Sequence, residues 1–438
     1  MQRLAGDLAR RAPLHQRVSR SRSTGAALVT QADSCDLSRS YAQLIAPEPV
    51  VGPVDPPLRL TPVHSTRSQN RLLVFVVPLD SNPYQECLYG PMRATHPDGI
   101  ELRYWQRRPW IGVAQFFPLA AWCALRGSRV AHVHWLAWDI RLNIPGRARL
   151  SGTVCRLAIR WLQLLGFRLV WTVHNVVPHE PQTDDDLGIV QVLADASSAV
   201  IVHSAVVLDA LADKQVATAR AIVIPQGSYI GLYGPPPDQE DARRYLGIRP
   251  TGRVVLFFGL VRAYKGVPEL LAAWSGAPQD GTLLVVGSCR DPALQADIEA
   301  AASDDRSIVL HLEFVPDDAV ATYVAACDAV CLPFRATTTS SSALLALSFS
   351  RPVIAPRLGA LQDLPDETGY YYRPDADAGL EQALARFFEE DDEGLLRRGA
   401  AGLAFAEGCT WPTISERTYE LYRSVAEGPP PGPDRPDR

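Results

Sequence analysis

The sequence lacks the features that mark membrane-spanning, zinc-binding and disulfide-linked proteins. No apolar run reaches the ~20 residues that a transmembrane helix needs. The eight cysteines form no C-x-x-C pair, and no histidine cluster accompanies Cys327 and Cys331, which argues against a zinc site. The scattered thiols are typical of a reducing compartment.

A strong excess of charge of one sign is also missing. The net charge of −5 gives no overall attraction for nucleic acid, and no nucleic-acid-binding motif is present. Nucleic acid is therefore not an expected partner, and any anion site must be local. The first apolar strand is not followed by G-x-G-x-x-G, which argues against a dinucleotide-dependent oxidoreductase.

The chain does contain enough apolar sequence for a large core. Its 438 residues are 47% hydrophobic and 21% charged, which predicts two or three folded domains. Residues 1–70 show no sustained hydrophobic period and residues 428–438 are rich in proline, so both are predicted to be disordered tails. The arginine-rich first thirty residues fit either a targeting segment or a disordered leader.

Between the tails, apolar segments of strand type alternate with segments of helix type. The first series of predicted strands comprises Leu72–Val77, Val130–Trp135, Arg168–Val173, Ala199–Val202 and Ala221–Ile224. After prolines 235–237, a second series comprises Arg253–Phe258, Leu283–Val286, Ile308–His311, Ala329–Leu332 and Val353–Ala355. Each series predicts a parallel α/β sheet, and such sheets bind ligands beyond the carboxyl ends of their strands.

The loop after the strand Arg253–Phe258 carries the strongest chemical signal. This strand ends at Gly259 and a helix begins near Gly266, with Arg262 and Lys265 between them. A loop that leads from a strand to a helix N-terminus favours a phosphate. Arg262 can contact two phosphate oxygens and Lys265 adds a point charge, although both can also be solvated surface cations.

Two further segments point to the same phosphate-binding end of the second sheet. Ser340, Ser341 and Ser342 precede the predicted helix Ala343–Phe349, where they offer a cap and free backbone N–H groups. Gly287 ends another strand and is predicted to line the nucleotide pocket. Simple capping of the helix, which needs one serine, is the alternative.

At this point a family resemblance becomes clear. Five segments resemble, in order over residues 253–425, the donor-binding domain of GT-B glycosyltransferases, close to the large retaining family 4: FFGLVRAYKG, LLVVGS, FVPDDAVATYVAACDAVCLPF, SRPVIAPRLGAL and CTWPTISERTYELY. The resemblance implies that Arg262 and Lys265 hold the diphosphate of a nucleotide sugar, which is a substrate. It implies no cofactor, and no metal is expected, because no D-x-D-like motif ends a strand.

The resemblance also implies a domain organisation. Two Rossmann-like α/β domains that face a cleft are expected, an acceptor-binding domain over residues 71–234 and a nucleotide-sugar-binding domain over residues 235–410. A crossover helix over residues 411–427 is expected to return to the first domain, with Trp411 near its start.

One departure from the family is informative. The retaining family carries two glutamates, eight residues apart, where this chain has Thr337 and Leu345. The usual ribose contact and the retention of configuration therefore do not carry over. The chain is similar instead to a divergent bacterial group that is linked to β-mannosyl transfer from GDP-mannose in exopolysaccharide assembly.

Candidate acceptor-side residues follow three strands of the first series. Asn82 and Tyr84 follow the first strand, where they can contact a sugar or form an ordinary turn. His132 and His134 face the same side of their strand; His132 is predicted to be structural, and His134 to reach the cleft. These positions make Asn82, Tyr84 and His134 candidate acceptor contacts.

The strand Arg168–Val173 runs directly into the remaining candidates. Its end carries His174 and Asn175, and His179 and Glu180 follow. Polar groups at the end of a buried strand are costly unless they are solvated or used. The resemblance places His174 close to the donor sugar. By their position after the strand, Asn175 is a candidate acceptor contact and His179 a candidate acceptor or base residue. An inverting transfer needs a general base, for which Glu180 is favoured over Asp80 and Asp139.

The function that the resemblance implies is a hexosyltransferase acting on a saccharide or lipid-linked acceptor, with mannose as one candidate sugar. A cytoplasmic protein at the inner face of the plasma membrane is expected. The basic, aromatic segments Arg103–Phe117 and Leu150–Arg168 either contact an anionic membrane or pack on the sheet with a solvated basic face. A nucleotide-sugar-binding protein without turnover and a GT-B epimerase or phosphorylase remain alternatives.

Overall fold

The computed structural model describes residues 71–79, 83–105, 112–135, 148–177, 185–276, 278 and 280–428. The predicted tails over residues 1–70 and 429–438 lie outside the described residues. The described helices and strands all belong to one compact unit of the chain. Among the described helices, none combines the length and the apolar character needed to cross a membrane.

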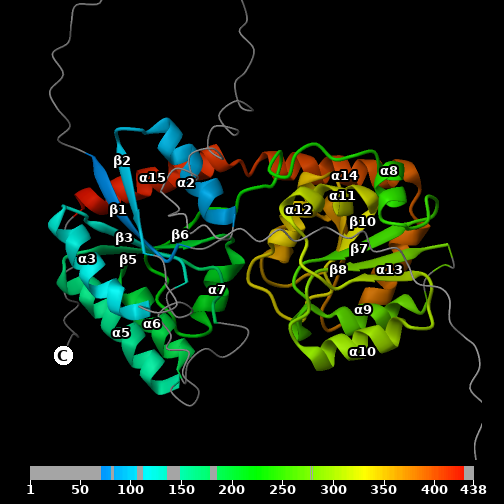
Figure 1. The fold of residues 1–438 in the computed structure, drawn as a ribbon, viewed down its shortest axis with the longest axis horizontal. Coiled ribbons are helices and arrows are strands. Elements are labelled where there is room, and N and C mark those ends of the chain that lie inside the picture. The colour runs from blue at the N-terminus through cyan, green and yellow to red at the C-terminus, as the bar shows by residue number, and fades with distance from the viewer. Residues whose placement is uncertain are drawn as a thin grey trace, which may run out of the picture. The chain divides into compact units, whose positions relative to one another are not determined.

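The first sheet has six parallel strands in the order β2-β1-β3-β4-β5-β6 (Figure 1). Its strands are β1 (Leu72–Val77), β2 (Ile100–Tyr104), β3 (Val130–Val133), β4 (Arg168–Thr172), β5 (Ser197–Val202) and β6 (Ala221–Val223). All strands predicted for this sheet are confirmed, with small shifts of their ends. Strand β2 was not predicted, because its sequence IELRY is short and its side chains are mostly half-buried.

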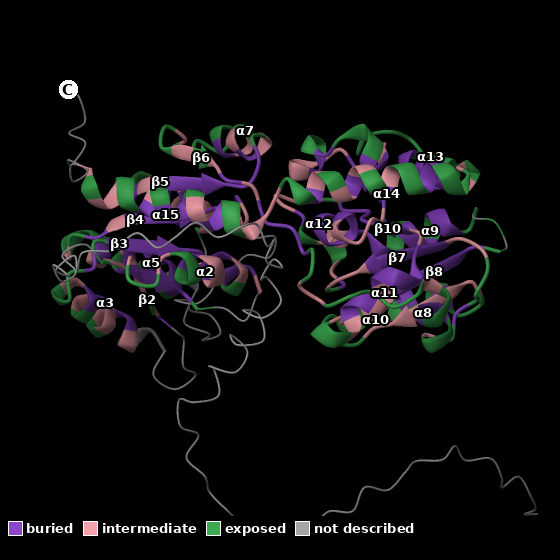
Figure 2. Cartoon of the chain, turned by 90° about the horizontal axis from the view of Figure 1, so that it is seen from above, coloured by how far each residue is buried: buried purple, intermediate pink, exposed green. Residues whose placement is uncertain are grey.

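Helices cover both faces of this sheet. They are α2 (Pro83–Thr95), α3 (Phe116–Leu125), α5 (Ala148–Leu164), α6 (Asp186–Ala196), α7 (Val206–Ala212) and the short 3-10 helix η1 (Gly112–Gln115). Along β1, Phe75 and Val77 enter one core with α3, α5 and α6, while Val74 and Val76 enter another with α2. This alternation explains why the run is apolar throughout: both faces of the strand are buried. Figure 2 shows the strands β3 and β5 of the same sheet coloured as buried.

The last helix, α15 (Trp411–Glu427), packs against the first sheet and not the second. Its residues Ile414, Tyr419 and Tyr422 join the core that also contains α2. His96, directly after α2, hydrogen-bonds to Glu416 at 2.7 Å, and Ser415 donates to the carbonyl of Leu88. The last described helix, α15, therefore packs against the first described helix, α2.

The second sheet is also parallel, with six strands in the order β12-β11-β10-β7-β8-β9. Its strands are β7 (Val254–Phe258), β8 (Thr282–Val286), β9 (Ile308–His311), β10 (Ala329–Cys331), β11 (Val353–Pro356) and β12 (Gly369–Tyr372). The helices are α8 (Gln239–Tyr245), α9 (Val267–Trp274), α10 (Pro292–Ala302), α11 (Asp317–Ala326), α12 (Ser341–Ser348), α13 (Gly379–Glu389) and α14 (Asp392–Glu407). Strand β12 was missed, because its sequence GYYY is short and begins with a glycine.

The strand order places one switch point in each sheet. In the second sheet, β7 lies between β8 and β10, so successive connections leave it in opposite directions. In the first sheet, β1 lies between β2 and β3 in the same way. Open α/β sheets bind ligands at such points, beyond the carboxyl ends of the strands. The domain boundaries proposed from the sequence stay predictions.

Candidate active site

The loop between β7 and α9 holds the predicted diphosphate site. Lys265 ends the 3-10 helix η2 (Ala263–Lys265), and Gly266, the N-cap of α9, has a left-handed φ of 73°. A Cβ on Gly266 would lie 1.9 Å from the carbonyl oxygen of Pro333, so the backbone can approach only because this residue is glycine. The amide of Arg335 also donates to Tyr264 at 2.8 Å. The loops after β7 and β10 are thus held together at the switch point.

Lys265 and Ser342 converge above the end of β7. A Cβ built on Gly259 would lie 3.1 Å from Lys265 Nζ and 3.7 Å from Ser342 Oγ. Gly287 at the end of β8 approaches so closely that its Cβ would lie 2.1 Å from the Gly259 carbonyl oxygen. An ammonium, a hydroxyl and closely packed glycine backbone therefore meet at one point, which is the arrangement that a phosphate group requires.

The three predicted serines have three different partners. Ser340 caps α12 by accepting from the amide of Ala343 at 3.2 Å. The side chain of Ser341 accepts from Gln226 at 2.8 Å, and Ser342 donates to the carbonyl of Phe258 at 3.4 Å. Of the three, Ser342 lies beside Lys265. The assignment of all three to the donor stays a prediction.

If Lys265 holds the diphosphate as predicted, nucleotide binding should depend on pH. Burial, and secondly the positive charge of Arg262, lower the pKa of Lys265 to about 8. A diphosphate prefers the protonated ammonium, so affinity should be highest below this pKa and fall as pH rises through it. We expect nucleoside diphosphate affinity to drop about tenfold between pH 7 and pH 9, measured by titration calorimetry.

The matched control is Lys265→Arg, because a guanidinium stays charged over this range. This variant should bind with little change between the two pH values. An equal loss of affinity in Lys265→Arg would show that another group controls the pH dependence.

The glutamate positions of the retaining family have become structural here. Leu345 is 7% exposed and packs in the core of the second sheet. Thr337 donates its hydroxyl to the carbonyl of Thr339 at 2.8 Å. An apolar core position cannot hold a charged carboxylate without a large desolvation cost. The departure seen in the sequence is therefore built into the packing of α12.

In the first sheet, histidines from three strand ends surround one tyrosine. The ring of Tyr84, 5% exposed, lies 5.7 Å from His134, 4.8 Å from His174 and 5.5 Å from His203 between ring centroids. These histidines follow β3, β4 and β5. Trp411 of α15 closes the group at 5.3 Å from Tyr84. Tyr84 is thus the packing centre of this cluster, and its contact with an acceptor stays a prediction.

The prediction that His132 and His134 face the same side of their strand is confirmed, since their rings lie 4.0 Å apart. Both are buried and hydrogen-bonded. His132 Nε2 lies 2.8 Å from the hydroxyl of Thr172, which fits its predicted structural role. His134 Nδ1 lies 3.1 Å from His174 Nε2, so His134 reaches the candidate site through another histidine.

Burial keeps these histidines neutral. It lowers the pKa of His132 to about 3 and that of His203 to about 4. Burial also holds the pKa of His134 and His174 well below the ordinary value, and charge on neighbouring histidines would lower each further. A base works best when its pKa lies near the operating pH. In the free protein, His174 is therefore suited to act as a neutral hydrogen-bonding group.

The strand end that carries His174 contacts the loop after β10. Thr339 donates its hydroxyl to the carbonyl of His174, and the amide of Val176 donates to Thr338, each at 3.4 Å. The segment after β6 is joined in the same way, because the amide of Tyr229 donates to Ser348 at 2.9 Å. The loop that carries the candidate residue His174 is thus hydrogen-bonded to the loop that precedes the three candidate donor serines.

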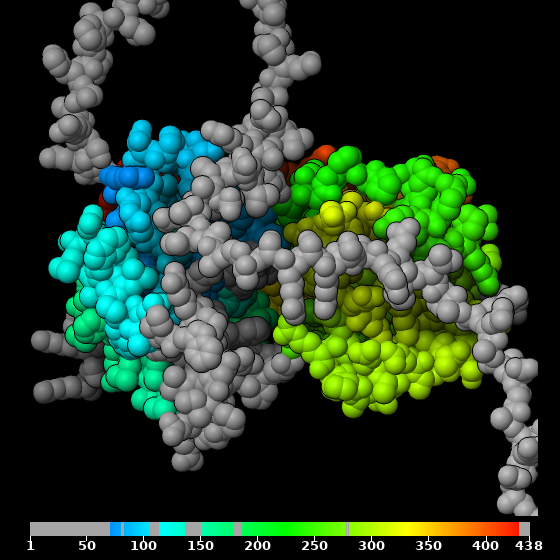
Figure 3. Space-filling model, in the orientation of Figure 1, coloured from blue at the N-terminus to red at the C-terminus, as the bar shows by residue number. Residues whose placement is uncertain are grey.

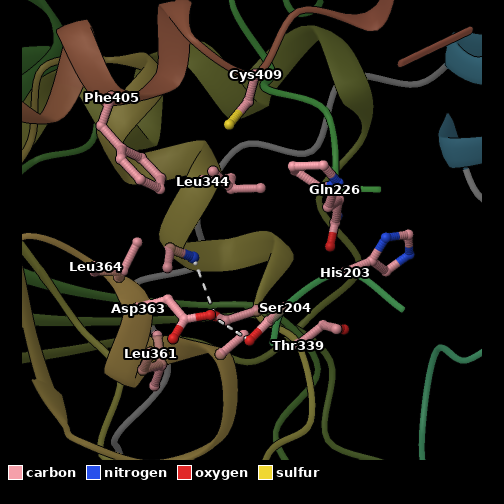
Figure 4. A pocket seen from close by; sticks show the side chains of 14 residues that line it. His203, Ser204, Gln226, Thr339, Leu344, Leu361, Asp363, Leu364, Phe405 and Cys409 are labelled. Carbon is pink, nitrogen blue, oxygen red and sulfur yellow. Dashed lines mark hydrogen bonds between the residues drawn. The ribbon is translucent and has the colours of Figure 1, made fainter. Parts of the chain in front are cut away.

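A small pocket adjoins these contacts. Figure 4 shows Asp363 of the 3-10 helix η3 (Gly359–Asp363) pointing toward Ser204, with which it hydrogen-bonds. The remaining wall combines residues after β5 and β6 with α12 and the end of α14, among them His203, Gln226, Leu344 and Phe405. Ser340 lines this pocket, whereas Arg262 and Lys265 do not.

Three predicted site residues lie outside the described residues: Asn82, His179 and Glu180. The carboxylates Asp80 and Asp139 lie outside them as well. Asn175 is half-buried beside His174. The roles assigned to all these residues stay predictions.

The structure adds two residues to the candidate site that the sequence did not reveal. Tyr89 lies in the middle of α2 and Tyr422 near the end of α15, and both hydroxyls reach the histidine cluster. Neither position follows a strand or belongs to a recognisable motif. A helix interior offers no sequence signal for such a contact.

The two parallel sheets and the basic loop at a switch point define the class of protein. Residues 252–390 match the family Glycosyl transferases group 1. The fold is GT-B, and the chain is a nucleotide-sugar hexosyltransferase. The family resemblance stated from the sequence is confirmed.

Curated relatives extend over both sheets. The chain is 26% identical over 369 residues to a GDP-mannose:glycolipid 4-beta-D-mannosyltransferase of Xanthomonas campestris, covering 83% of this chain and 92% of the relative. A D-inositol 3-phosphate glycosyltransferase of Corynebacterium urealyticum is 25% identical over 378 residues, covering 78% and 87%.

Solved structures share the fold at lower identity. A sucrose-phosphate synthase from Thermosynechococcus elongatus superposes with a TM-score of 0.66 at 20% identity, covering 81% of this chain and 99% of that one. The Anabaena protein HepE in complex with UDP and glucose superposes with a TM-score of 0.62 at 18% identity, covering 81% and 100%.

Proposed function

We propose that the chain transfers mannose from GDP-mannose to a saccharide or lipid-linked saccharide acceptor in exopolysaccharide or glycolipid synthesis. The observation that carries the donor side is the convergence of Lys265 and Ser342 at the end of β7. The choice of mannose and guanine is supported by the relative from Xanthomonas campestris, whose name states both.

Arg262 and Lys265 have a defined task in this proposal. Breaking the bond between the sugar and the diphosphate leaves negative charge on the leaving group, and two fixed cations stabilise that charge as it develops. They can do the work that a divalent cation does in other transferases, and we propose that no metal is needed. Activity that survives prolonged dialysis against a chelator would support this point, whereas recovery only after added Mg²⁺ would contradict it.

On the acceptor side, we propose His174 as a contact to the donor sugar and Glu180 as the base. The attacking hydroxyl must lose a proton as the new bond forms, and a neutral histidine of low pKa is a poor acceptor for it. A carboxylate is the better candidate. This assignment implies inversion of configuration, which the anomeric form of the product reports directly.

The first test is thermal unfolding of the purified protein with GDP, UDP, ADP or TDP. A nucleotide present at about 100 times its dissociation constant should stabilise the folded state by ~2.7 kcal/mol. We expect GDP to raise the unfolding temperature and the other three to do so much less. Stabilisation by UDP alone would mean that the donor carries uracil and not guanine. If none of the four nucleotides stabilised the protein, the proposed donor site would be contradicted.

We further propose a peripheral contact with an anionic membrane, which brings a lipid-linked acceptor within reach. Exposed apolar side chains line one face of α5, where Leu150, Leu157 and Leu164 recur every seven residues and are 40%, 50% and 80% exposed. On the neighbouring helix α3, Leu125 is 88% exposed, and α3 contributes to the surface seen in Figure 3 (cyan).

Basic side chains accompany this apolar face. The guanidinium of Arg126 lies 4.9 Å from the centre of the half-exposed Trp122 ring, and that of Arg103 lies 5.5 Å from it. Within the segment Arg103–Phe117, Trp105 and Phe116 are buried in the core, and residues 106–111 lie outside the described residues. The exposed apolar side chains of the proposed surface belong to α3 and α5. Such a basic and apolar face suits the interface of an anionic bilayer.

The membrane contact predicts that Leu157→Glu with Leu164→Glu weakens binding to phosphatidylglycerol vesicles at least about tenfold, because two apolar side chains can no longer enter the interface. Co-sedimentation measures the effect. Leu396→Glu, on an equally exposed leucine of α14, is the control and should leave binding unchanged. Equal binding of the double variant and the unaltered protein would contradict the proposal.

A further inference from the structure

We propose that Tyr89, His134 and Tyr422 are positioning residues that set the tautomer of His174, so that its Nδ1 presents an N–H to the substrate. This inference rests on the proposed role of His174 at the donor sugar. It adds that the last helix of the chain, through Tyr422, determines which hydrogen-bonding group His174 offers.

The orientation of the His174 ring follows from its contacts. Its Nε2 lies 3.1 Å from His134 Nδ1, and its ring stacks on Trp135 at 4.1 Å between centroids with an angle of 17° between planes. The rings of Tyr84 and His174 pack in a T-shaped arrangement. Since Nε2 is turned toward His134 and no described residue hydrogen-bonds to Nδ1, Nδ1 is the nitrogen left for a substrate.

Behind His174, the hydrogen bonds continue through His134 to the hydroxyl of Tyr89, where the series branches toward His132 and Tyr422. The hydroxyl of Tyr89 lies 2.9 Å from His134 Nε2 and 2.8 Å from His132 Nδ1. His132 Nε2 lies 2.8 Å from Thr172. A neutral imidazole has one N–H and one acceptor nitrogen, so each bond determines the direction of the next. The pair of His134 and His174 therefore has two arrangements of its protons, set by whether Tyr89 donates to His134.

The two arrangements present opposite groups to the substrate. If Tyr89 donates to His134 Nε2, then His134 donates from Nδ1 to His174, and the proton of His174 lies on Nδ1. If Tyr89 donates to His132 instead, then His174 donates from Nε2, and its Nδ1 is a bare acceptor. Which one holds depends on where Tyr89 directs its single hydroxyl proton.

Tyr422 decides between them. Its hydroxyl also hydrogen-bonds to His132 Nδ1. We assign His132 as a donor to Thr172 from Nε2 and as an acceptor at Nδ1, because two tyrosine hydroxyls, each with a proton to donate, face its Nδ1. An imidazole nitrogen accepts one strong hydrogen bond. With Tyr422 occupying it, Tyr89 donates to His134, and His174 becomes a donor at Nδ1.

The surrounding burial supports a fixed tautomer. His132 and His134 are 0% and 3% exposed, so water cannot insert into the series and exchange its protons freely. Burial also holds the pKa of all three histidines far below neutrality, so each ring stays neutral and carries a single N–H. A neutral donor aimed at an oxygen of the sugar or leaving group stabilises developing charge without being consumed.

The test is nitrogen NMR of the full-length protein with ¹⁵N-labelled histidine, which reports the protonated nitrogen of each ring. We expect His174 protonated at Nδ1 in the unaltered protein and at Nε2 in Tyr422→Phe. Tyr419→Phe is the matched control, because this tyrosine lies on the same helix, is 9% exposed and stacks on His96 instead. An unchanged His174 tautomer in Tyr422→Phe would overturn the inference.

Kinetics provide a second measurement. Tyr422→Phe and Tyr89→Phe should lower kcat at least about tenfold with the donor KM nearly unchanged, while Tyr419→Phe keeps both. If a tyrosine variant fails to fold, His134→Asn replaces it, because the amide can keep a bond to His174 that His134→Ala loses. Equal activity of His134→Asn and His134→Ala would contradict a positioning role. Because the tautomer is read without substrate, failure of the proposed donor assignment leaves this test intact.

Discussion

Replacing Arg262 and Lys265 together with alanine should abolish stabilisation by the donor nucleotide and lower kcat/KM by about 10²–10⁴. Each charge-assisted hydrogen bond to the diphosphate contributes ~1.5–3 kcal/mol, so removing both costs ~3–6 kcal/mol. Thermal unfolding with GDP and initial rates at low donor concentration measure the two effects. The loss should exceed that of either single variant, because both cations act on the same diphosphate.

The control removes the same charges elsewhere. Lys214 is exposed at the end of α7, and Arg397 is exposed on α14, where it pairs with Glu393 at 2.9 Å. Lys214→Ala with Arg397→Ala should therefore leave nucleotide binding and kcat/KM within about twofold, since solvated surface ion pairs contribute little. A similar loss in both double variants would mean that net charge, and not the loop after β7, controls donor binding.

Stability should fall steeply when the pH is lowered from 6.5 to 5.5. Four histidines, His132, His134, His174 and His203, have folded-state pKa values depressed by burial. Their ordinary pKa is about 6.5, so in this window the unfolded chain binds protons that the folded chain refuses, and the free energy of unfolding decreases as pH falls. Each histidine contributes ~1 kcal/mol over this interval, or ~4 kcal/mol together.

Urea unfolding followed by tryptophan fluorescence at pH 7.5, 6.5 and 5.5 measures this dependence. His203→Asn keeps a donor for the carbonyl of Ile224, which His203 Nδ1 contacts at 2.9 Å, but removes one titrating ring. The decrease between pH 6.5 and 5.5 should then be about one quarter smaller. A stability that stays level across this window would show that the cluster accepts protons while folded.

The donor side could be predicted in large part because its signals are local. The strand that ends in Gly259, the loop with Arg262 and Lys265 and the helix after it are neighbours in sequence. Their arrangement in space could therefore be predicted from the sequence. The three serines could not be told apart in the same way. Only the folded loop shows that Ser340 caps α12, Ser341 meets Gln226 and Ser342 lies beside Lys265.

On the acceptor side, the sequence predicted the positions of single residues but not the hydrogen bonds between them. The period of a strand was enough to place His132 and His134 on one face, and the end of a buried strand marked His174. The hydrogen bonds that orient His174 could not be predicted, because Tyr89 and Tyr422 lie 333 residues apart and each occupies a helix without any motif. Strands β2 and β12 escaped prediction for a related reason: their short, mixed sequences become strands only beside a longer neighbour.

By itself, the sequence determined the local elements: buried strands from continuous apolar runs, the basic loop from its spacing, and the absence of the paired glutamates. The tertiary structure alone decided the order of strands, the two switch points and the return of α15 to α2. Hydrophobic burial and backbone sterics act within a few residues and can be read along the chain. The order of strands and the partners of Tyr422 depend on burying surfaces that are distant in sequence, so they are determined only when the whole core is packed.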